Sequence, residues 1–164
     1  MQRVIVAALT GLAFLTLPSL ACAQDINSPI VGLWKLTSNV TKIVATGAMQ
    51  PLAGEHPIGY QLFTKGGHII YIQNAENRKR PAGATATDAE RVALFNSMVA
   101  YAGTYKLDGS KVLIHMEANA VPGEPDRSYA MEISGNKLTL TAASPFMSST
   151  GQQIVSMRTF ERAE

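Results

Sequence analysis

Cysteine is almost absent from the sequence. The single cysteine, Cys22, lies near the N-terminus in a segment that we expect to be removed from the mature chain. Without it, a disulfide framework, a thiolate metal site and a cysteine nucleophile are all excluded.

An excess of charge of one sign is also missing. The formal net charge is +2, and acidic and basic residues are interspersed along the chain. Domains that bind nucleic acid normally carry a basic surface, so no nucleic-acid partner is expected. The only basic run, Arg78-Lys79-Arg80, is flanked by asparagine, proline and glycine, and we interpret it as a solvated loop without an assigned function.

Long apolar runs are missing beyond the N-terminus. The one long run, Val4 to Leu17, follows the positive charge of Arg3 and is too short to cross a bilayer comfortably. Ala21-Cys22-Ala23 then supplies the small-x-small pattern that a signal peptidase reads. We predict a cleaved signal peptide over residues 1–23 and a periplasmic or secreted mature chain that begins at Gln24.

A competing interpretation makes Cys22 a lipidated membrane anchor. Ser19 stands where such signals have leucine, and Leu20 stands where they have a small residue. No membrane anchor is therefore expected.

The mature chain contains no internal repeat, low-complexity tract or domain linker. Residues 24–164 are about the length of one domain and are enough to bury a core without disulfides or a structural metal. The stretch from Gly47 to Pro57 is interpreted as a long loop inside this domain.

Turn residues recur at short intervals, and the segments between them are rich in β-branched and aromatic residues. This pattern is typical of an all-β protein. Glycines in three short connections, Lys65-Gly66-Gly67, Asp108-Gly109 and Ser134-Gly135-Asn136, supply the positive φ of tight hairpins and predict antiparallel neighbours. The predicted strands are Leu33 to Val40, Lys42 to Thr46, Gly59 to Lys65, His68 to Asn74, Gly103 to Leu107, Lys111 to Asn119, Arg127 to Ser134, Lys137 to Ala142 and Gln153 to Glu161.

One helix interrupts the strands. Thr87 followed by Glu90 forms a capping-box pattern at its start. Apolar residues then recur at helical spacing up to Val99, and Gly103 is expected to stop the helix. The predicted helix runs from about Asp88 to Tyr101.

A meander of this kind has two sheet edges, and closing the sheet into a barrel is the commonest way to remove them. We therefore predict a single antiparallel up-and-down β-barrel of about eight to nine strands with one interrupting helix. About eight strands leave room for one small ligand.

Short motifs along the mature chain resemble those of a known family. The first strand opens with Gly32-Leu33-Trp34. The motifs that follow, in order, are Pro57-Ile58-Gly59-Tyr60, Phe63-Thr64-Lys65-Gly66-Gly67, Tyr101-Ala102-Gly103-Thr104-Tyr105, His115-Met116-Glu117 and Phe160-Glu161-Arg162. Together they resemble the lipocalin-like domain family of bacteria and fungi over nearly the whole mature chain.

The resemblance implies a closed or nearly closed barrel with a cavity for a small molecule. By analogy with lipocalins, it also implies a tryptophan at the barrel base covered by an arginine from the final strand. Trp34, just after Gly32, would be that tryptophan, and Arg162 or, in another register, Arg158 would cover it. We interpret this group as structural, with a cation–indole contact worth about 0.5 to 2 kcal/mol.

His115 and Glu117 project from the same face of their predicted strand, and a histidine beside a carboxylate is a common kernel of proton-transfer catalysis. A cofactor-free isomerase, cyclase or lyase could use His115 with Glu117 or Tyr129. The opposite face of the strand is apolar, however, and ordinary burial would leave His115 and Glu117 in water.

Other chemistries find less support. No pair among the three histidines His56, His68 and His115 has a spacing that helps two ligands share one metal ion. No Gly-x-Ser-x-Gly nucleophile elbow occurs. Neither a metal nor any other cofactor is predicted.

Tyrosines and methionines on the predicted strands could form a deformable pocket wall with hydroxyls that orient a guest, although plain core filling explains them equally well. The predicted ligand-binding residues are Tyr60, Tyr71, Tyr105, Met116, Tyr129 and Met131. The loop from Gly47 to Pro57 and the turn from Pro145 to Gly151 could cover one mouth of the barrel.

Three functions remain open from the residues alone. The first is an exported barrel that binds a small hydrophobic or aromatic molecule. The second is the cofactor-free enzyme with the His115 and Glu117 pair, and the third is a structural domain without a ligand. The residues fix neither the oligomeric state nor the identity of a ligand.

The cleavage site gives a first testable prediction. N-terminal sequencing of the exported protein is expected to begin at Gln24, because the small-x-small pattern ends at Ala23. A chain that begins at Cys22 with a lipid attached would contradict the prediction.

Overall fold

The computed structural model describes residues 28–123, 125–148 and 150–164. The predicted signal peptide and the predicted mature N-terminus lie outside these residues. Within them the chain forms ten strands and one helix. These are β1 (Gly32–Ile43), β2 (Met49–Pro51), β3 (Ile58–Phe63), β4 (His68–Asn74), α1 (Asp88–Asn96), β5 (Met98–Asp108), β6 (Lys111–Asn119), β7 (Arg127–Ser134), β8 (Lys137–Ala142), β9 (Phe146–Met147) and β10 (Gln153–Arg162).

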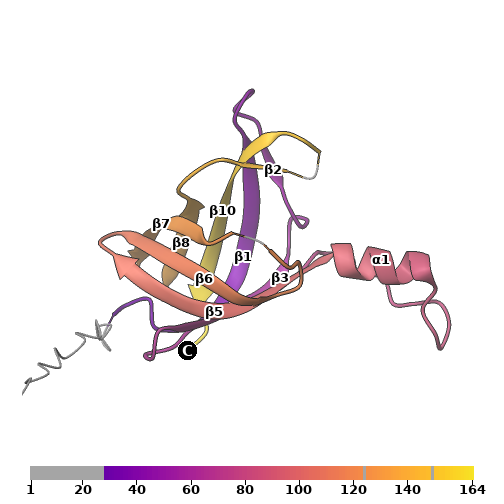
Figure 1. The fold of residues 1–164 in the computed structure, drawn as a ribbon, viewed down its shortest axis with the longest axis horizontal. Helices are drawn as coiled ribbons and strands as arrows, with labels where there is room; N and C mark the ends of the chain where they lie inside the picture. The colour runs from indigo at the N-terminus through magenta and orange to yellow at the C-terminus, as the bar shows by residue number, and fades with distance from the viewer. Residues whose placement is uncertain (1–27, 124, 149) are drawn as a thin grey trace, which may run out of the picture.

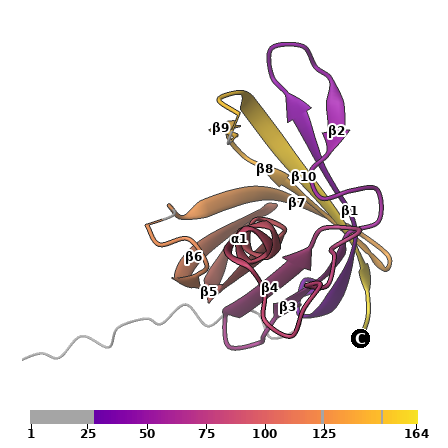
Figure 2. The same ribbon diagram turned by 90° about the vertical axis from the view of Figure 1, so that its right-hand side faces the viewer.

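Eight of the strands close into an antiparallel barrel. Around the barrel the order is β1-β3-β4-β5-β6-β7-β8-β10, and β10 pairs back onto β1 from Trp34↔Arg162 to Ile43↔Ile154. Figures 1 and 2 show the strands arranged around a common axis, while the short strands β2 and β9 pair with the ends of β1 and β10 beyond it. The predicted all-β barrel with one helix is therefore confirmed.

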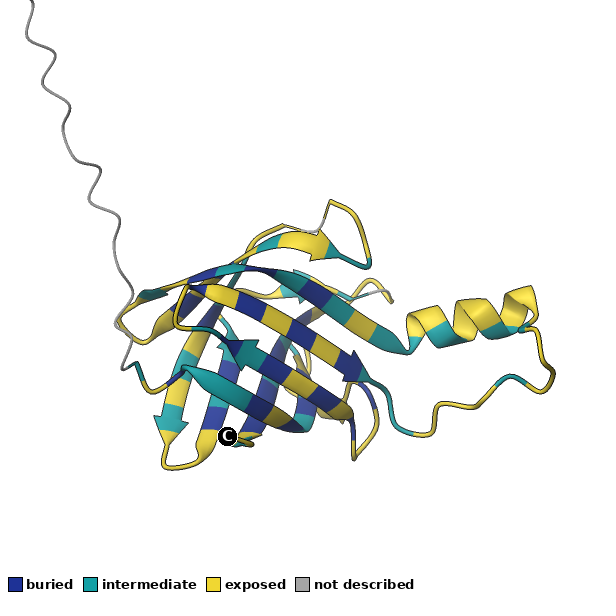
Figure 3. Cartoon of the chain, turned by 90° about the horizontal axis from the view of Figure 1, so that it is seen from below, coloured by how far each residue is buried: buried dark blue, intermediate teal, exposed yellow. Residues whose placement is uncertain are grey.

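Side chains alternate between the interior and the surface along each barrel strand, as Figure 3 shows by burial. On β10 the inward positions are Ile154, Ser156, Arg158 and Phe160, and all four are buried. Polar and charged residues thus occupy the middle of an inward-facing row.

One end of the barrel is closed by Trp34, which is fully buried. Its indole Nε1 donates a hydrogen bond of 2.7 Å to the carbonyl of Ile30. The Arg162 guanidinium lies over the indole at 4.2 Å from the ring centroid, as the first of the two expected registers predicts. Gly32 makes room for this contact, because a Cβ at this position would lie only 2.8 Å from Arg162 Nη1. The backbone of Gly32 also has a φ of +135°, which disfavours any residue with a side chain.

The register between β5 and β6 shifts at a bulge between Ala102 and Gly103. A Cβ at Gly103 would lie only 2.0 Å from the carbonyl oxygen of His115, so only glycine allows the two backbones to approach this closely. Gly103 therefore lies within a strand, and the expectation that it stops a helix was wrong.

The predicted helix was too long at its C-terminal end. It begins at Asp88 with the predicted capping box between Thr87 and Glu90, but it ends at Asn96. Met98 to Thr104 instead pair with β4, which satisfies their backbone groups and buries Tyr101, whereas α1 itself buries no residue. A longer helix without a buried face would have gained little stability.

Two strands predicted at the start of the chain are in fact one. β1 runs without a break through Thr41, which is buried and pairs with Ser156 of β10. The predicted loop from Gly47 to Pro57 contains the short strand β2, and the turn from Pro145 contains β9.

Helix α1 projects from one end of the barrel (Figures 1 and 3). Arg78, from the basic run that we interpreted as a loop, ties the end of this helix to β4. Its side chain donates hydrogen bonds to Asn74 Oδ1, Ser97 Oγ and the carbonyl of Leu94. The run thus contributes to the position of α1.

Trp34→Ala is expected to lower the free energy of unfolding by about 3–5 kcal/mol, because truncating a buried aromatic removes apolar burial and leaves a cavity. Urea unfolding followed by far-UV circular dichroism measures the change. Phe95→Ala, at a half-exposed position on α1, serves as control and is expected to stay within about 0.5 kcal/mol of the wild type. An unchanged midpoint for Trp34→Ala would show that the indole does not hold the base together.

Candidate functional site

A cavity of about 300 Å³ opens at the end of the barrel opposite Trp34. Its deep wall comes from β5, β6, β7 and β10, and its mouth comes from α1, the start of β5, the loops after β2 and β6, and β9. The residues on these strands include Tyr101, Met116, Asn119, Arg127, Tyr129, Ser156 and Arg158, and those at the mouth include Leu52, Phe95, Val99, Val121 and Phe146.

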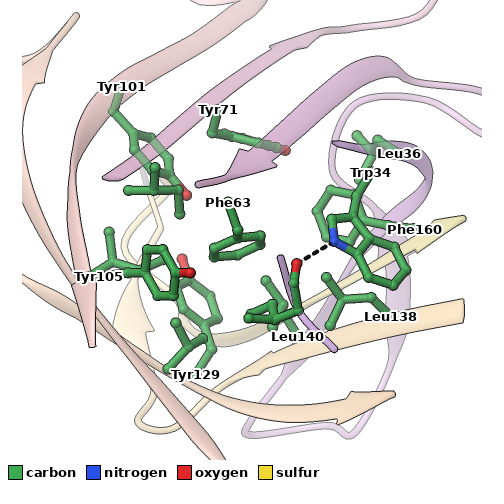
Figure 4. Close-up of a cluster of buried hydrophobic side chains, with 14 residues drawn as sticks. Trp34, Leu36, Phe63, Tyr71, Tyr101, Tyr105, Tyr129, Leu138, Leu140 and Phe160 are labelled. Carbon is green, nitrogen blue, oxygen red and sulfur yellow. Dashed lines mark hydrogen bonds between the residues drawn. The ribbon is translucent and has the colours of Figure 1, made fainter. Parts of the chain in front are cut away.

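Arg158 is the charged group of this cavity, and only 8% of its surface is exposed. Its guanidinium lies over two tyrosine rings, at 4.6 Å from the centroid of Tyr71 and 5.3 Å from that of Tyr129. Figure 4 shows these tyrosines and Tyr101 pointing into the barrel. The faces of the rings replace part of the water that the cation has lost.

Direct hydrogen bonds satisfy this guanidinium only in part. Arg158 Nη1 donates to the hydroxyl of Tyr101 at 3.1 Å. Arg158 Nε and the hydroxyl of Ser156 are buried without a hydrogen-bond partner among the described residues. No Asp or Glu of the described chain forms an ion pair with Arg158, since the pairs there are Arg91–Asp88 and His115–Asp126.

A chain of amides and a hydroxyl continues from this group along the barrel wall. Tyr71 donates to Gln73 Oε1 at 2.5 Å, and Asn39 Nδ2 donates to the same oxygen at 2.6 Å. The side-chain amide of Gln61 is fully buried, and neither of its polar atoms has a partner within the described part of the chain. An interior with several unsatisfied polar atoms is adapted to contain water or the polar part of a guest.

Tyr71 and Tyr101 keep their protons at neutral pH. Burial raises the pKa of Tyr101 and Tyr71 above the ordinary value of 10, although the nearby Arg158 opposes the shift. For Arg158, burial lowers the pKa, but the oxygens of Tyr129, Tyr71 and Tyr101 more than offset burial and raise it. The cavity therefore holds a permanent cation beside neutral hydroxyls that can donate hydrogen bonds.

A larger hollow of about 640 Å³ lies on the other side of Arg127, between the start of β7 and the loops before β7 and β10. Most of the residues around it are exposed or half-buried. We place the candidate site in the smaller cavity because buried and unsatisfied polar groups meet there, next to aromatic rings.

Comparison with protein families decides where the chain belongs. The model of the lipocalin-like domain matches residues 31–163, which is most of the chain. The chain belongs to the lipocalin-like domain family. No curated protein matches its sequence.

Five predicted ligand-binding residues of this lipocalin-like barrel point inward. Met116 and Tyr129 line the cavity directly. Tyr71 contributes the ring under Arg158, and Tyr105 lies deeper, where its hydroxyl donates to the carbonyl of Thr64 at 2.9 Å. Met131 is half-buried and packs against the core.

The placement of Tyr60 in a pocket wall was wrong. Its side chain is 41% exposed on the outer face of β3, whereas its neighbour Gln61 is fully buried. The strand alternation forces this arrangement, since Gly59, Gln61 and Phe63 take the inward positions. Strand β3 thus contributes the buried amide of Gln61, and not the tyrosine, to the interior.

His115 and Glu117 lie on the outer face of β6, as the alternation of that strand favoured. His115 Nδ1 is 2.8 Å from Asp126 Oδ1, and the two side chains are 62% and 68% exposed. They do not share the cavity with Tyr129, so the structure does not bring together the groups of the enzyme hypothesis. The inward face of β6 instead carries Ile114 and Met116.

The sequence alone suggests Arg158 only as a substitute for Arg162 over Trp34. Its true place follows from the register of β10, in which Arg158 and Arg162 are both inward positions separated by one buried aromatic, Phe160. The alternation of β10 was the available signal: Arg158 is two residues from Phe160 and four from Ile154, so it shares the face of these apolar residues. The sequence held no similar sign that Ser156 and the amides of Asn39, Gln61 and Gln73 are buried, because their inward positions depend on the strand register.

Among residues 28–123, 125–148 and 150–164, no three His, Cys, Asp or Glu side chains are placed to hold a metal ion. Within the same ranges, no helix is long and apolar enough to cross a membrane.

Proposed function

We propose that this lipocalin-like barrel is exported and binds a small hydrophobic or aromatic molecule outside the cytoplasm. The observation that carries the proposal is the cavity of about 300 Å³ at one end of the barrel. Small-molecule sites combine mostly apolar walls with a few polar groups that converge on the guest. The cavity has both, since Met116 and the tyrosine rings flank the polar atoms of Ser156 and Arg158.

The mouth of the cavity supports an apolar guest. Large apolar side chains around it stay exposed, at 50% for Leu52, 49% for Phe95, 39% for Val99 and 49% for Val121. They come from a loop, from α1, from β5 and from the turn after β6, so separate parts of the chain converge on one opening. Contiguous exposed apolar surface of this kind is typical of a binding site.

Export remains part of the proposal and is supported by the pattern of residues 1–23. The proposal assigns no role to His115 and Glu117, because they lie on the outside of the barrel. It therefore describes a carrier or scavenger, and no bond is made or broken in the guest.

Binding is tested with N-phenyl-1-naphthylamine, a neutral probe whose fluorescence rises in apolar surroundings. The wild-type mature protein is expected to bind it saturably. Met116→Trp is expected to weaken binding at least about tenfold, since the added ring occupies the cavity and displaces favourable apolar contacts of the probe. The readout is a fluorescence titration at equilibrium.

Leu113→Trp is the matched control, because Leu113 lies on the outer face of the same strand and is 41% exposed. It is expected to bind the probe as the wild type does. Absence of saturable binding to the wild type, or equal affinity in all three proteins, would reject the cavity as a ligand site.

A further inference from the structure

The two arginines of β10 are satisfied to different degrees. Both Nη atoms of Arg162 donate to carbonyls, those of Val31 and Pro29, and its plane covers Trp34. Arg158 has one hydrogen bond, to a neutral hydroxyl, and its Nε is unpartnered among the described residues although the side chain is over nine-tenths buried. The hydrogen bonds of Arg162 are made to the protein backbone, whereas Arg158 keeps a buried donor without an acceptor among the described residues.

A buried cation without an anion is unfavourable in the folded protein. Burial removes hydration from the guanidinium, and tyrosine rings with one hydroxyl return only part of it. None of the buried polar side chains of the described chain is a carboxylate, since they are Asn39, Thr41, Gln61, Gln73, Ser156 and Arg158. The protein itself therefore does not provide the missing anion within these residues.

Donors without acceptors gather where the cavity meets Arg158. Ser156 lies two residues earlier on the same face of β10, and its hydroxyl is buried without a partner in the described part of the chain. Tyr101 accepts from Arg158 and keeps its own proton to donate. All three side chains line the cavity, so a guest that enters it comes next to these unpartnered donors.

We propose that the guest is a small organic acid whose carboxylate binds to Arg158, with Ser156 and Tyr101 as further donors and an apolar or aromatic body that extends toward the mouth. This inference rests on the proposed function and specifies the chemical class of its ligand. The planar fork of a guanidinium matches the two oxygens of a carboxylate. The apolar rim at Leu52, Phe95 and Val121 then faces the other end of the same molecule.

A matched pair of probes tests the charge directly. 2-Naphthoate and 2-naphthamide have the same ring and nearly the same shape, but only the first is an anion at neutral pH. Isothermal titration calorimetry with the wild-type mature protein is expected to give at least about tenfold tighter binding of the acid, as charge-assisted hydrogen bonds in a buried site are roughly twice as strong as neutral ones.

The preference should depend on one side chain. Arg158→Met replaces the guanidinium by a shorter, unbranched apolar side chain and leaves no orphaned charge, so the variant is expected to fold and to be at least as stable as the wild type by thermal unfolding. It is expected to bind the acid and the amide within about threefold of each other. Arg91→Met removes the same charge from an exposed position on α1 that pairs with Asp88, and it is expected to keep the preference.

The outcomes separate this inference from the proposed function. Equal affinity of the wild type for acid and amide, with N-phenyl-1-naphthylamine still bound, would overturn the inference and leave the proposed function standing. A preference that survives in Arg158→Met would overturn the assignment of Arg158. If the wild type binds none of the three probes, the proposed function fails, and the inference fails with it.

Discussion

The pairing of β1 with β10 is the constraint on which the rest of the structure depends. It runs from Trp34↔Arg162 to Ile43↔Ile154 and turns an open meander into a closed barrel without sheet edges. Because closure fixes which side chains of both strands point inward, it places Arg162 over the indole of Trp34 and Arg158 inside the barrel. The structural base and the candidate site are thus two consequences of one register.

The interior that closure creates is divided along the barrel axis. Near Trp34 most of the inward side chains are apolar, with Phe63, Leu138 and Phe160 fully buried, although the buried amide of Gln61 lies there too, opposite Trp34 on β3. Toward the other end, buried polar groups replace them and a cavity opens between β5, β6, β7 and β10. Folding stability is supplied at the base, so the open end can retain unsatisfied donors that a fully packed core would exclude.

Local patterns in the sequence were sufficient for most of the fold. The hairpin glycines predicted the turns between β3 and β4, β5 and β6, and β7 and β8, where Gly67, Gly109 and Gly135 all have positive φ. The Gly-x-Trp motif and the family resemblance placed Trp34 and Arg162. These features could be predicted because they depend on short segments and on a family pattern.

The features that could not be predicted depend on contacts far apart in the chain. The end of α1 is set by the pairing of β5 with β4, which overrides the helical spacing of Val99. Tyr60 faces outward because Gln61 takes the inward position of β3, a choice that the composition of the motif does not reveal. Arg158 became a candidate only when the closed register placed it among three tyrosines that lie on other strands.

A small organic acid held on the buried cation should stay with the barrel through purification. Native mass spectrometry of the mature protein isolated from its own host, followed by release of any guest under denaturing conditions, tests it most directly. We expect a protein-bound species that is released on unfolding and detected as an anion with an apolar or aromatic body. A released guest that is neutral or cationic, or a protein found only in its unbound mass, would contradict this expectation.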